Sequence, residues 1–404
     1  MNRSVADIEP GWAGADPFDA SFKDDPYAVL NPLREQHRVN LTPVGTYRVT
    51  RYDDLKSIFK HARTSMTLAN GESPNFHPAD ERGSFRDFLL NLDDPKHIRL
   101  RKLVFKSFNN RTVKRFEIEA KDIADNTMQR ALAAGGMDLI ADLAHLLPSQ
   151  IVCRIMGVPE ADRELFTRWT AARTNAFFAR FLPDEIVQSL VDAGNEMADY
   201  FDDLVRERRK HLRDDLLSEL IRAEEDGDRL LDGEIVVQAI GVIVAGFETT
   251  IGLIGNGARA LIEHPAQMAL LRNQPDLLNN CIEECLRYDT PVLFNWRVLV
   301  EPYRVGEVVI PEDAVIWQML ACGNRDPRQF DKPDEFRIDR ENVAHQSFGG
   351  GSHFCLGNQL AKVEARHALG TFARETRHLA IVPGQPTWSD SFFRVLGSFP
   401  VTFN

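Results

Sequence analysis

The segment FGGGSHFCLG occupies residues 348–357 and is the most informative stretch of the 404-residue chain. It places Cys355 at the end of a glycine-rich run, and a helical pattern begins directly after it. The N–H groups and the dipole at a helix N-terminus favour a thiolate over a thiol. Glycines let the backbone approach a flat, bulky group closely. We therefore interpret Cys355 as a nucleophile or a metal ligand, with a buried structural cysteine as the alternative.

The composition of the chain is that of a soluble globular protein, with 43% hydrophobic and 27% charged residues. The number of cysteines is odd and no CxxC pair occurs, which argues against a disulfide framework and against structural zinc. The longest nearly apolar run, residues 235–247, is shorter than the roughly 20 residues that span a membrane. We expect a cytoplasmic protein without a membrane segment.

No internal repeat or shift in composition divides the chain, so we expect one domain over residues 1–404. Apolar residues recur with helical spacing through most of the chain, and β-branched residues cluster in two short regions. The fold class expected is mainly α with a small β-sheet region. Helices are predicted at 112–134, 137–156, 183–211, 232–262, 275–288 and about 356–374, with Asp232 as an N-cap, and strands near 38–50 and 301–316.

The spacing Phe-x2-Gly-x3-Cys-x-Gly arises by chance in about one chain in a thousand of this composition. Its residues resemble the heme-binding loop of the cytochromes P450, in particular the soluble, bacterial-type class. The resemblance implies that Cys355 is the proximal thiolate ligand of the iron of heme b (iron protoporphyrin IX) and that it favours O–O cleavage. The residues of the loop that it assigns to cofactor binding are Phe348, Gly351, His353, Cys355 and Gly357.

A second motif, AGFETT at residues 245–250, falls within the predicted helix 232–262. It is similar to the acid–alcohol pair that the family carries over the distal face of the heme. By that resemblance, Ala245 and Gly246 lie beside the cofactor and leave room for dioxygen. Thr249 would hold the bound oxygen or a water, and Glu248 would relay protons. In the alternative, Thr249 bonds to a carbonyl one turn earlier and Glu248 is a solvated helix residue.

Two further sets of residues fit the resemblance. Glu284 and Arg287 form an ExxR pair, whose family role is to brace the cysteine loop together with a residue near 324–327. Arginine can bind a propionate carboxylate through a bidentate fork, although a surface cation is the alternative for each candidate. The candidates for heme-propionate binding are His97, Arg101, Arg297 and His353.

Positive charge is concentrated in residues 96–115, which hold eight Lys/Arg and no Asp/Glu in a chain of net charge −12. We interpret this stretch as a docking site for an acidic ferredoxin, served by a separate ferredoxin reductase. Lys102, Lys106 and Arg111 are the candidate contacts, and a solvated charged helix is the alternative. The acidic remainder of the chain argues against nucleic acid as a partner.

Aromatic and aliphatic residues stand in the regions that line the substrate pocket of relatives, and many of them could equally be core. They suggest a small apolar or aromatic substrate. The candidates are Phe85, Phe88, Leu89, Phe178, Phe247, Val292, Phe294 and Phe393.

The resemblance predicts a monooxygenase that hydroxylates or epoxidises its substrate with O2 and two electrons. Two other functions remain open for the same chain. One is an H2O2-dependent peroxygenase on the same fold, and the other is a non-catalytic heme-thiolate sensor.

Overall fold

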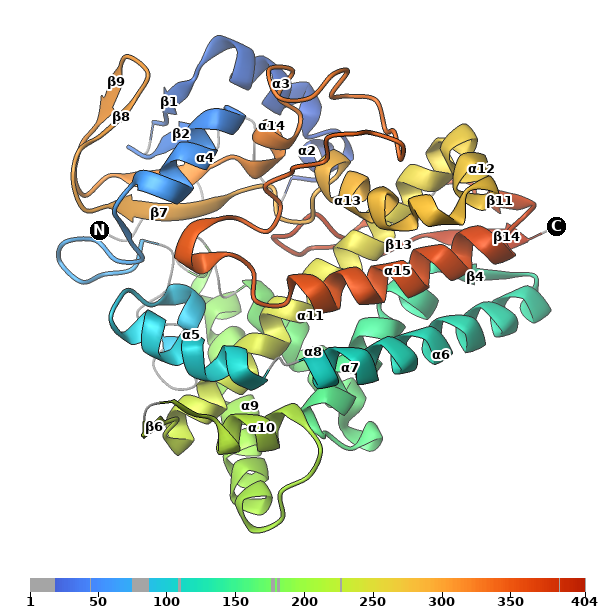
Figure 1. Ribbon diagram of the computed structural model, residues 1–404, viewed down its shortest axis with the longest axis horizontal. Coiled ribbons are helices and arrows are strands. Elements are labelled where there is room, and N and C mark those ends of the chain that lie inside the picture. Colours follow the sequence, from blue (N-terminus) through green and yellow to red (C-terminus); the bar gives the residue numbers. More distant parts are fainter. Residues whose placement is uncertain are drawn as a thin grey trace. The chain divides into compact units, whose positions relative to one another are not determined.

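Helices dominate the part of the chain that the structure describes, and short strands form small sheets between them (Figure 1). The computed structural model describes residues 19–43, 45–74, 87–107, 110–175, 179, 182–225, 227–384 and 386–403. Two compact units are present. Unit 1 comprises Met1–Ala6, Ser65–Ile118 and Pro148–Glu248, and unit 2 comprises Asp7–Thr64, Glu119–Leu147 and Thr249–Asn404.

Unit 1 is built mainly from helices whose end charges suit the helix dipole. In α9, Asp184 and Glu185 occupy the first turn and Arg208 to Lys210 the last, which places each charge at the favourable end. Asp215 caps α10 by accepting a hydrogen bond from the Ser218 N–H at 2.8 Å. The elements of this unit, some shared with unit 2 across a boundary, are η3 (Leu89–Asn91), α5 (Lys96–Ser107), α6 (Asn110–Ala134), α7 (Leu146–Met156), η5 (Glu160–Asp162), α8 (Arg163–Thr174), α9 (Asp184–Lys210), α10 (Leu216–Arg222), β5 (Glu224–Glu225), β6 (Asp228–Arg229) and α11 (Asp232–Glu263).

The long helix α11 contributes residues to both units and is apolar along most of its length. Gln238 interrupts its apolar run, and both the oxygen and the nitrogen of its buried carboxamide are hydrogen-bonded. The carboxamide oxygen accepts from the Leu89 N–H at 3.1 Å, and the amide nitrogen donates to the Asp87 carbonyl at 2.9 Å. Gly241 leaves room for the ring of Phe88, because a Cβ there would lie 2.0 Å from a ring carbon. These contacts fix the segment before η3 against α11.

Unit 2 holds the remaining helices, of which α14 precedes and α15 follows the cysteine loop in the sequence. Helix α15 begins directly after Gly357, and Pro265 stands at the first position of α12, where its missing N–H costs nothing. The helical elements of this unit are α2 (Ala20–Asp24), α3 (Tyr27–Gln36), α4 (Tyr52–His61), η4 (Leu139–Ala144), α12 (Pro265–Asn273), η7 (Pro275–Leu277), α13 (Leu278–Tyr288), α14 (Leu320–Asn324), η8 (Gly351–His353) and α15 (Asn358–Glu375).

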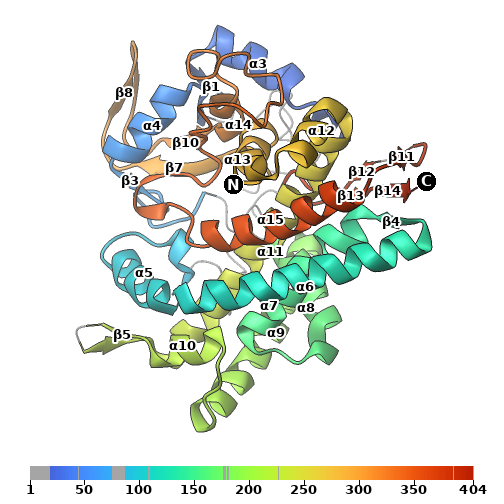
Figure 2. The ribbon, with the colours of Figure 1, turned by 45° about the vertical axis from the view of Figure 1, so that its right-hand side comes forward.

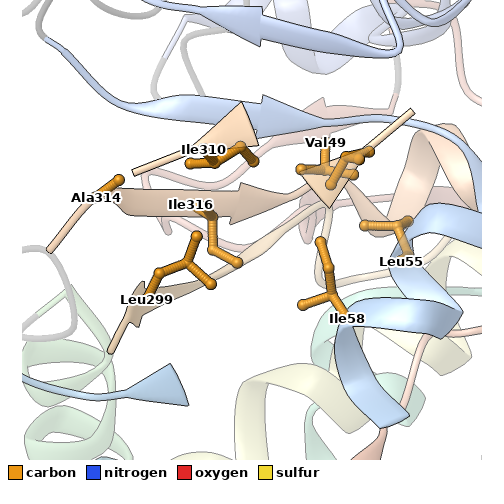
Figure 3. Packing of buried hydrophobic residues seen from close by; sticks show 8 residues of the cluster. Val49, Leu55, Ile58, Leu299, Ile310, Ala314 and Ile316 are labelled. Atoms are coloured by element: carbon orange, nitrogen blue, oxygen red, sulfur yellow. The ribbon is translucent and has the colours of Figure 1, made fainter. Parts of the chain in front are cut away.

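The largest sheet has the strand order β1-β2-β10-β7-β3. Its strands are β1 (Val39–Leu41), β2 (Tyr47–Val49), β3 (Thr64–Ser65), β7 (Asn295–Leu299) and β10 (Val315–Gln318). Strand β10 pairs in parallel with β2 and antiparallel with β7, with Ile316 opposite Tyr47 and Arg297. Figure 3 shows the buried cluster on this sheet, made by Val49, Leu55, Ile58, Leu299, Val305, Ile310, Ala314 and Ile316. This cluster ties α4 to the sheet.

Smaller sheets complete unit 2. Strands β8 (Tyr303–Val305) and β9 (Val308–Ile310) form a hairpin, and β12 (Thr387–Trp388) pairs with β13 (Leu396–Ser398). The third sheet has the order β11-β14-β4 and lies near the C-terminus (Figure 2). Its strands are β4 (Gly136–Asp138), β11 (Leu379–Ile381) and β14 (Pro400–Phe403).

The expected helices are confirmed, with differences at their ends. The prediction of helix from residue 137 is wrong, because Gly136–Asp138 forms β4 and pairs with β14. Gly135 has a φ of +76° that ends α6, and a Cβ at Gly136 would lie 2.6 Å from the Val401 carbonyl oxygen. Asp232 is the first residue of α11 rather than the residue before it. Strand β7 and the C-terminal strands were not predicted.

Among the described residues, two helical stretches are long and apolar enough to span a membrane by length and composition alone, Leu139–Met156 and Asp232–Glu263. In each, 67% of the most apolar 18-residue window is buried inside the protein. Such burial is typical of core helices.

Candidate functional site

Cys355 differs from the other four cysteines in its exposure. Cys153, Cys281, Cys285 and Cys322 are buried, whereas Cys355 is partly exposed. Burial raises the pKa of the Cys153 thiol to about 11 and that of Cys322 to about 12. By its exposure, Cys355 is therefore the cysteine best suited to bind a ligand.

The backbone around Cys355 forms a closed turn in front of a helix. The Cys355 N–H donates to the Phe348 carbonyl at 3.0 Å, which closes the loop on itself. The side-chain amide of Asn358, the first residue of α15, donates to the Cys355 carbonyl at 2.8 Å. The sulfur thus lies within one turn of the N-terminal end of an 18-residue helix, where the dipole favours negative charge.

The three consecutive glycines of the loop, 349–351, are required by backbone conformation, by close packing, or by both. Gly349 and Gly351 have φ values of +68° and +65°, which side-chain-bearing residues rarely adopt. A Cβ at Gly350 would lie 2.7 Å from the ring of Phe59, and one at Gly351 would lie 2.5 Å from the Phe59 carbonyl oxygen. The loop therefore rests directly on the C-terminal end of α4, and Phe59 was not predicted from the sequence.

The ExxR pair is fully buried and engages a third residue that was not predicted. Glu284 and Arg287 contact each other at 2.7 Å, and both side chains are 0% exposed. Arg287 also donates to the Asn324 carbonyl at 2.9 Å, which agrees with the expected neighbourhood at 324–327. The second cation on Glu284 is Arg340, at 3.1 Å. The sequence signal for it was the FRIDR stretch at 336–340, which follows the turn-rich region.

The middle of α11 has partly exposed residues between buried ones. Ala245, Gly246 and Thr249 are partly exposed and lie at spacings of one helical turn, whereas Phe247 and Glu248 are buried. A Cβ built at Gly246 would have no atom within 4 Å. The face that Ala245, Gly246 and Thr249 share could accept a flat group against the backbone of the helix.

The candidate cations for propionate binding lie on three elements. His97 and Arg101 are on α5 in unit 1, one turn apart, and the buried His97 directs Nδ1 to Asp94 at 3.2 Å. Arg297 is on β7 in unit 2, and it donates to the Trp296 carbonyl. His353 ends η8 inside the cysteine loop. Asn295 brings β7 beside this loop, because its amide nitrogen is 3.7 Å from a Cβ built at Gly349.

The candidate pocket residues form one group in each unit. In unit 1, Phe88 and Leu89 pack against α11, on which Phe247 is buried. In unit 2, Phe294 stacks on Trp317 and meets Phe392 edge to face, and Phe392 in turn contacts Phe393. Val292 is partly exposed beside them in the sequence. Phe85 and Phe178 lie outside the described residues.

The basic stretch 96–115 is partly neutralised within unit 1. Arg99 pairs with Asp228 and Glu234, each at 2.6 Å, and Lys96 pairs with Asp87 at 2.7 Å. Lys102 and Lys106 are exposed on α5, in which Phe105 is 61% exposed. Nothing is described of the Arg111 side chain.

The residues present fit a heme held by a cysteine. In unit 2, Cys355 is partly exposed at a helix N-terminus, and Arg297 and His353 carry donors that carboxylates need. In unit 1, α11 has no Cβ at Gly246, and His97 and Arg101 carry further donors of this kind.

Comparison with known proteins identifies the family. The sequence profile described as Cytochrome P450 matches residues 20–381. Cytochrome P450 107B1 of Saccharopolyspora erythraea is 36% identical over 95% of this chain and 96% of its own length. Cytochrome P450 monooxygenase PikC of Streptomyces venezuelae is 36% identical over 94% and 91%. The solved structure of P450BioI, in complex with an acyl carrier protein ligated to hexadec-9Z-enoic acid, matches with a TM-score of 0.88 and 29% identity over 95% of this chain and 99% of that chain. The chain therefore belongs to the cytochrome P450 family of heme-dependent monooxygenases.

Proposed function

We propose that this chain is a bacterial-type monooxygenase in which Cys355 ligates the heme iron and a small apolar or aromatic substrate is hydroxylated or epoxidised. The observation that carries this proposal is the partly exposed Cys355, held at the N-terminus of α15 by a loop whose glycines cannot be replaced without strain or collision. Because the helix dipole favours the thiolate, the ligand is ready in its charged form.

When bound, the heme supplies the reductive activation of O2 that no amino acid side chain provides. His97, Arg101, Arg297 and His353 would bind its propionates. Since Nδ1 of His97 is directed to Asp94, His97 would meet a propionate through Nε2. Ala245 and Gly246 would lie beside the ring, where the absence of a side chain on Gly246 leaves space for O2. Phe348, Gly351 and Gly357 would shape the loop around the sulfur.

Glu248 and Thr249 are assigned to proton delivery. Thr249 is partly exposed on α11, and its hydroxyl would hold a water or dioxygen by a hydrogen bond. Glu248, its neighbour in the sequence, is 9% exposed, and its carboxyl would relay protons from solvent. The two residues would separate proton supply from bulk water, which limits the release of unused reduced oxygen.

The substrate class follows from the lining residues. Phe88, Leu89 and Phe247 in unit 1, and Phe294 and Phe393 in unit 2, are buried apolar or aromatic residues, and Val292 is partly exposed. Such a lining binds a compound by burial of apolar area and by ring contacts, with few polar anchors. Phe85 and Phe178 belong to the same proposal by sequence alone.

Electrons would come from an acidic ferredoxin that docks near residues 96–115, reduced in turn by a separate reductase. Lys102 and Lys106 are the proposed contacts on α5, and Arg111 is a third by sequence. Electrostatic attraction of this kind raises the rate of encounter and falls with salt. We propose that the protein works in the cytoplasm, where reduced ferredoxin is available.

Reconstitution tests the proposal. The purified holoprotein is mixed with an acidic ferredoxin, its reductase, NADH and ethylbenzene, styrene or indole, and oxygenated product is measured against NADH consumed. We expect product that requires ferredoxin, and in Thr249→Ala a loss of product per NADH of about tenfold or more. Fast turnover with H2O2 that needs no ferredoxin and survives Thr249→Ala would establish a peroxygenase instead. NADH consumption without product from any compound would favour a sensor.

A further inference from the structure

Glu283 directly precedes the glutamate of the ExxR pair. Its side-chain contacts have no part in the motif roles described above. Its carboxylate lies on α13 and holds two partners. Oε2 is 3.0 Å from Nε2 of His345, and Oε1 is 2.6 Å from Nζ of Lys362. His345 precedes the cysteine loop and Lys362 follows it on α15. One side chain on α13 thus joins the two segments that flank Cys355, and we call these three residues the Glu283 bridge.

The hydrogen bonds fix the tautomer of His345. The Ser347 N–H donates to Nδ1 at 3.1 Å, so Nδ1 carries no proton. Nε2 therefore carries the proton and donates to Glu283. Burial lowers the pKa of His345, whose side chain is 4% exposed, and this keeps the ring neutral. Although burial alone would raise the pKa of Glu283, its bonds to His345 and Lys362 hold that pKa below its usual value.

Both partners of Glu283 contact the first residue of the cysteine loop. The Lys362 ammonium lies 5.3 Å from the ring centroid of Phe348, and the His345 ring centroid lies 5.7 Å from it. The carbonyl of Phe348 accepts the Cys355 N–H at 3.0 Å. Ser347 lies between His345 and Phe348 in the sequence, and its hydroxyl donates to the Leu286 carbonyl on α13 at 2.7 Å. A continuous series of contacts therefore runs from Glu283 to the backbone of Cys355.

Glu283 and its neighbour Glu284 serve different parts of the chain. Glu284 holds Arg287 and Arg340, and its Oε1 accepts the Arg337 N–H at 2.9 Å. Successive residues of a helix point about 100° apart, so the two carboxylates address different segments from one turn. Glu284 secures the segment before the loop, and Glu283 secures the loop itself.

We propose that Glu283 is a positioning residue for the proximal cysteine: by holding His345 and Lys362 against Phe348, it sets the orientation of the loop that carries the Cys355 sulfur. This inference rests on the proposed ligation of the heme by Cys355. Residues around a metal ligand commonly tune its bond to the metal, so the effect should be seen in the heme spectrum as well as in stability.

The test uses purified holoprotein and the variants Glu283→Gln, Lys362→Met and His345→Gln. Glu263→Gln is the matched control, because Glu263 pairs with a cation, Arg259, at the far end of α11. The measurement is the Soret band of the reduced carbon monoxide complex and the rate at which its red-shifted form is lost in mild urea. We expect Glu283→Gln to keep the red-shifted band but to lose it about tenfold faster than the parent and the control. The double variant Glu283→Gln/His345→Gln should decay no faster than Glu283→Gln alone.

A rate for Glu283→Gln equal to that of the control would overturn this inference and leave the ligation by Cys355 standing. The inference would also be overturned if the double variant lost the band at a rate raised by the product of the two single-variant factors, because the two side chains would then act independently. A parent protein without the red-shifted band would refute both the inference and the proposed function. If Glu283→Gln yields no holoprotein, the same rate is measured for Lys362→Met. Faster loss of the band than in the control supports the inference, and an equal rate overturns it.

Discussion

The guanidinium of Arg340 lies 3.1 Å from the carboxylate of Glu284, which is completely buried. Arg287 faces the same carboxylate at 2.7 Å, so two cations share one anion in the interior of unit 2. Arg340 also donates to the Glu335 carbonyl at 2.9 Å. The irregular segment before the cysteine loop is therefore anchored to α13 through charged hydrogen bonds rather than through regular secondary structure.

Removal of Arg340 should destabilise the protein strongly. Arg340→Ala leaves the buried Glu284 with one cation instead of two and leaves the carbonyls that Arg340 binds without this donor. We expect the free energy of unfolding to fall by about 3–5 kcal/mol. Urea unfolding followed by circular dichroism measures this loss. Arg337→Ala is the control, because that side chain is 34% exposed and reaches only exposed acids. Equal losses for the two variants would contradict the account.

Gly241 and Gly233 are two glycines of α11 with opposite surroundings. A Cβ at Gly241 would collide with the ring of Phe88, whereas one at Gly233 would have no atom within 4 Å. We expect Gly241→Ala to lose about 1–3 kcal/mol and Gly233→Ala to gain up to about 1 kcal/mol from its better helix propensity. In a Phe88→Ala background the cost of Gly241→Ala should vanish. If thermal unfolding still shows the cost there, Phe88 is not its cause.

Glu364 should make stability depend on pH. Burial on α15 raises the pKa of this carboxyl to about 8, and among the described residues its Oε2 has no hydrogen-bond partner. Between the ordinary value of 4.5 and about 8, the folded protein keeps a proton that the unfolded chain releases. The free energy of unfolding therefore falls as pH rises through this window, by up to about 1.4 kcal/mol per pH unit, and levels off above it.

Glu364→Gln should remove this part of the slope. Urea titrations of the parent and the variant at pH 5, 6.5 and 8 measure this slope. The free energy of unfolding of the variant should rise relative to that of the parent as pH rises. Parallel curves for the two proteins would show that Glu364 is ionised in the folded state.

Charge reversal at Lys102 and Lys106 should weaken the response to ferredoxin. We expect Lys102→Glu/Lys106→Glu to raise the ferredoxin concentration for half-maximal turnover about tenfold at low salt, with little difference from the parent at high salt. Arg206→Glu/Lys210→Glu, a double reversal of exposed cations on α9, is the control that makes the same change in net charge. A shift of the same size in the control, or one that persists at high salt, would mean that α5 is not the docking site.

Motifs that act through local backbone were predictable from the sequence. The cysteine loop, the ExxR pair and α11 each rest on residues close together in the chain, so local patterns and the family resemblance that they carry were enough to identify them. Arg340 and Phe59 were not found, because their contacts with Glu284 and Gly351 join segments far apart in sequence. Strand β4 was read as helix for the same reason: its pairing with β14 at the other end of the chain overrides the local pattern.

The pocket was the least predictable part. Phenylalanines suit a core and a substrate wall equally well, and Phe294 and Phe393 do pack with other aromatic residues. The apolar and aromatic character of these residues could be inferred from the sequence. The substrate that they select depends on the shape of the pocket, which the sequence does not give.

The most direct measurement of the central claim is the spectrum of the reduced carbon monoxide complex in the parent and in Cys355→Ser. The parent should show a strongly red-shifted Soret band, because a thiolate donates electron density to the iron. Cys355→Ser should lose that band, whereas Cys153→Ser, a substitution at a buried cysteine, should keep it. A red-shifted band that survives in Cys355→Ser, or a parent spectrum typical of histidine ligation, would contradict the account.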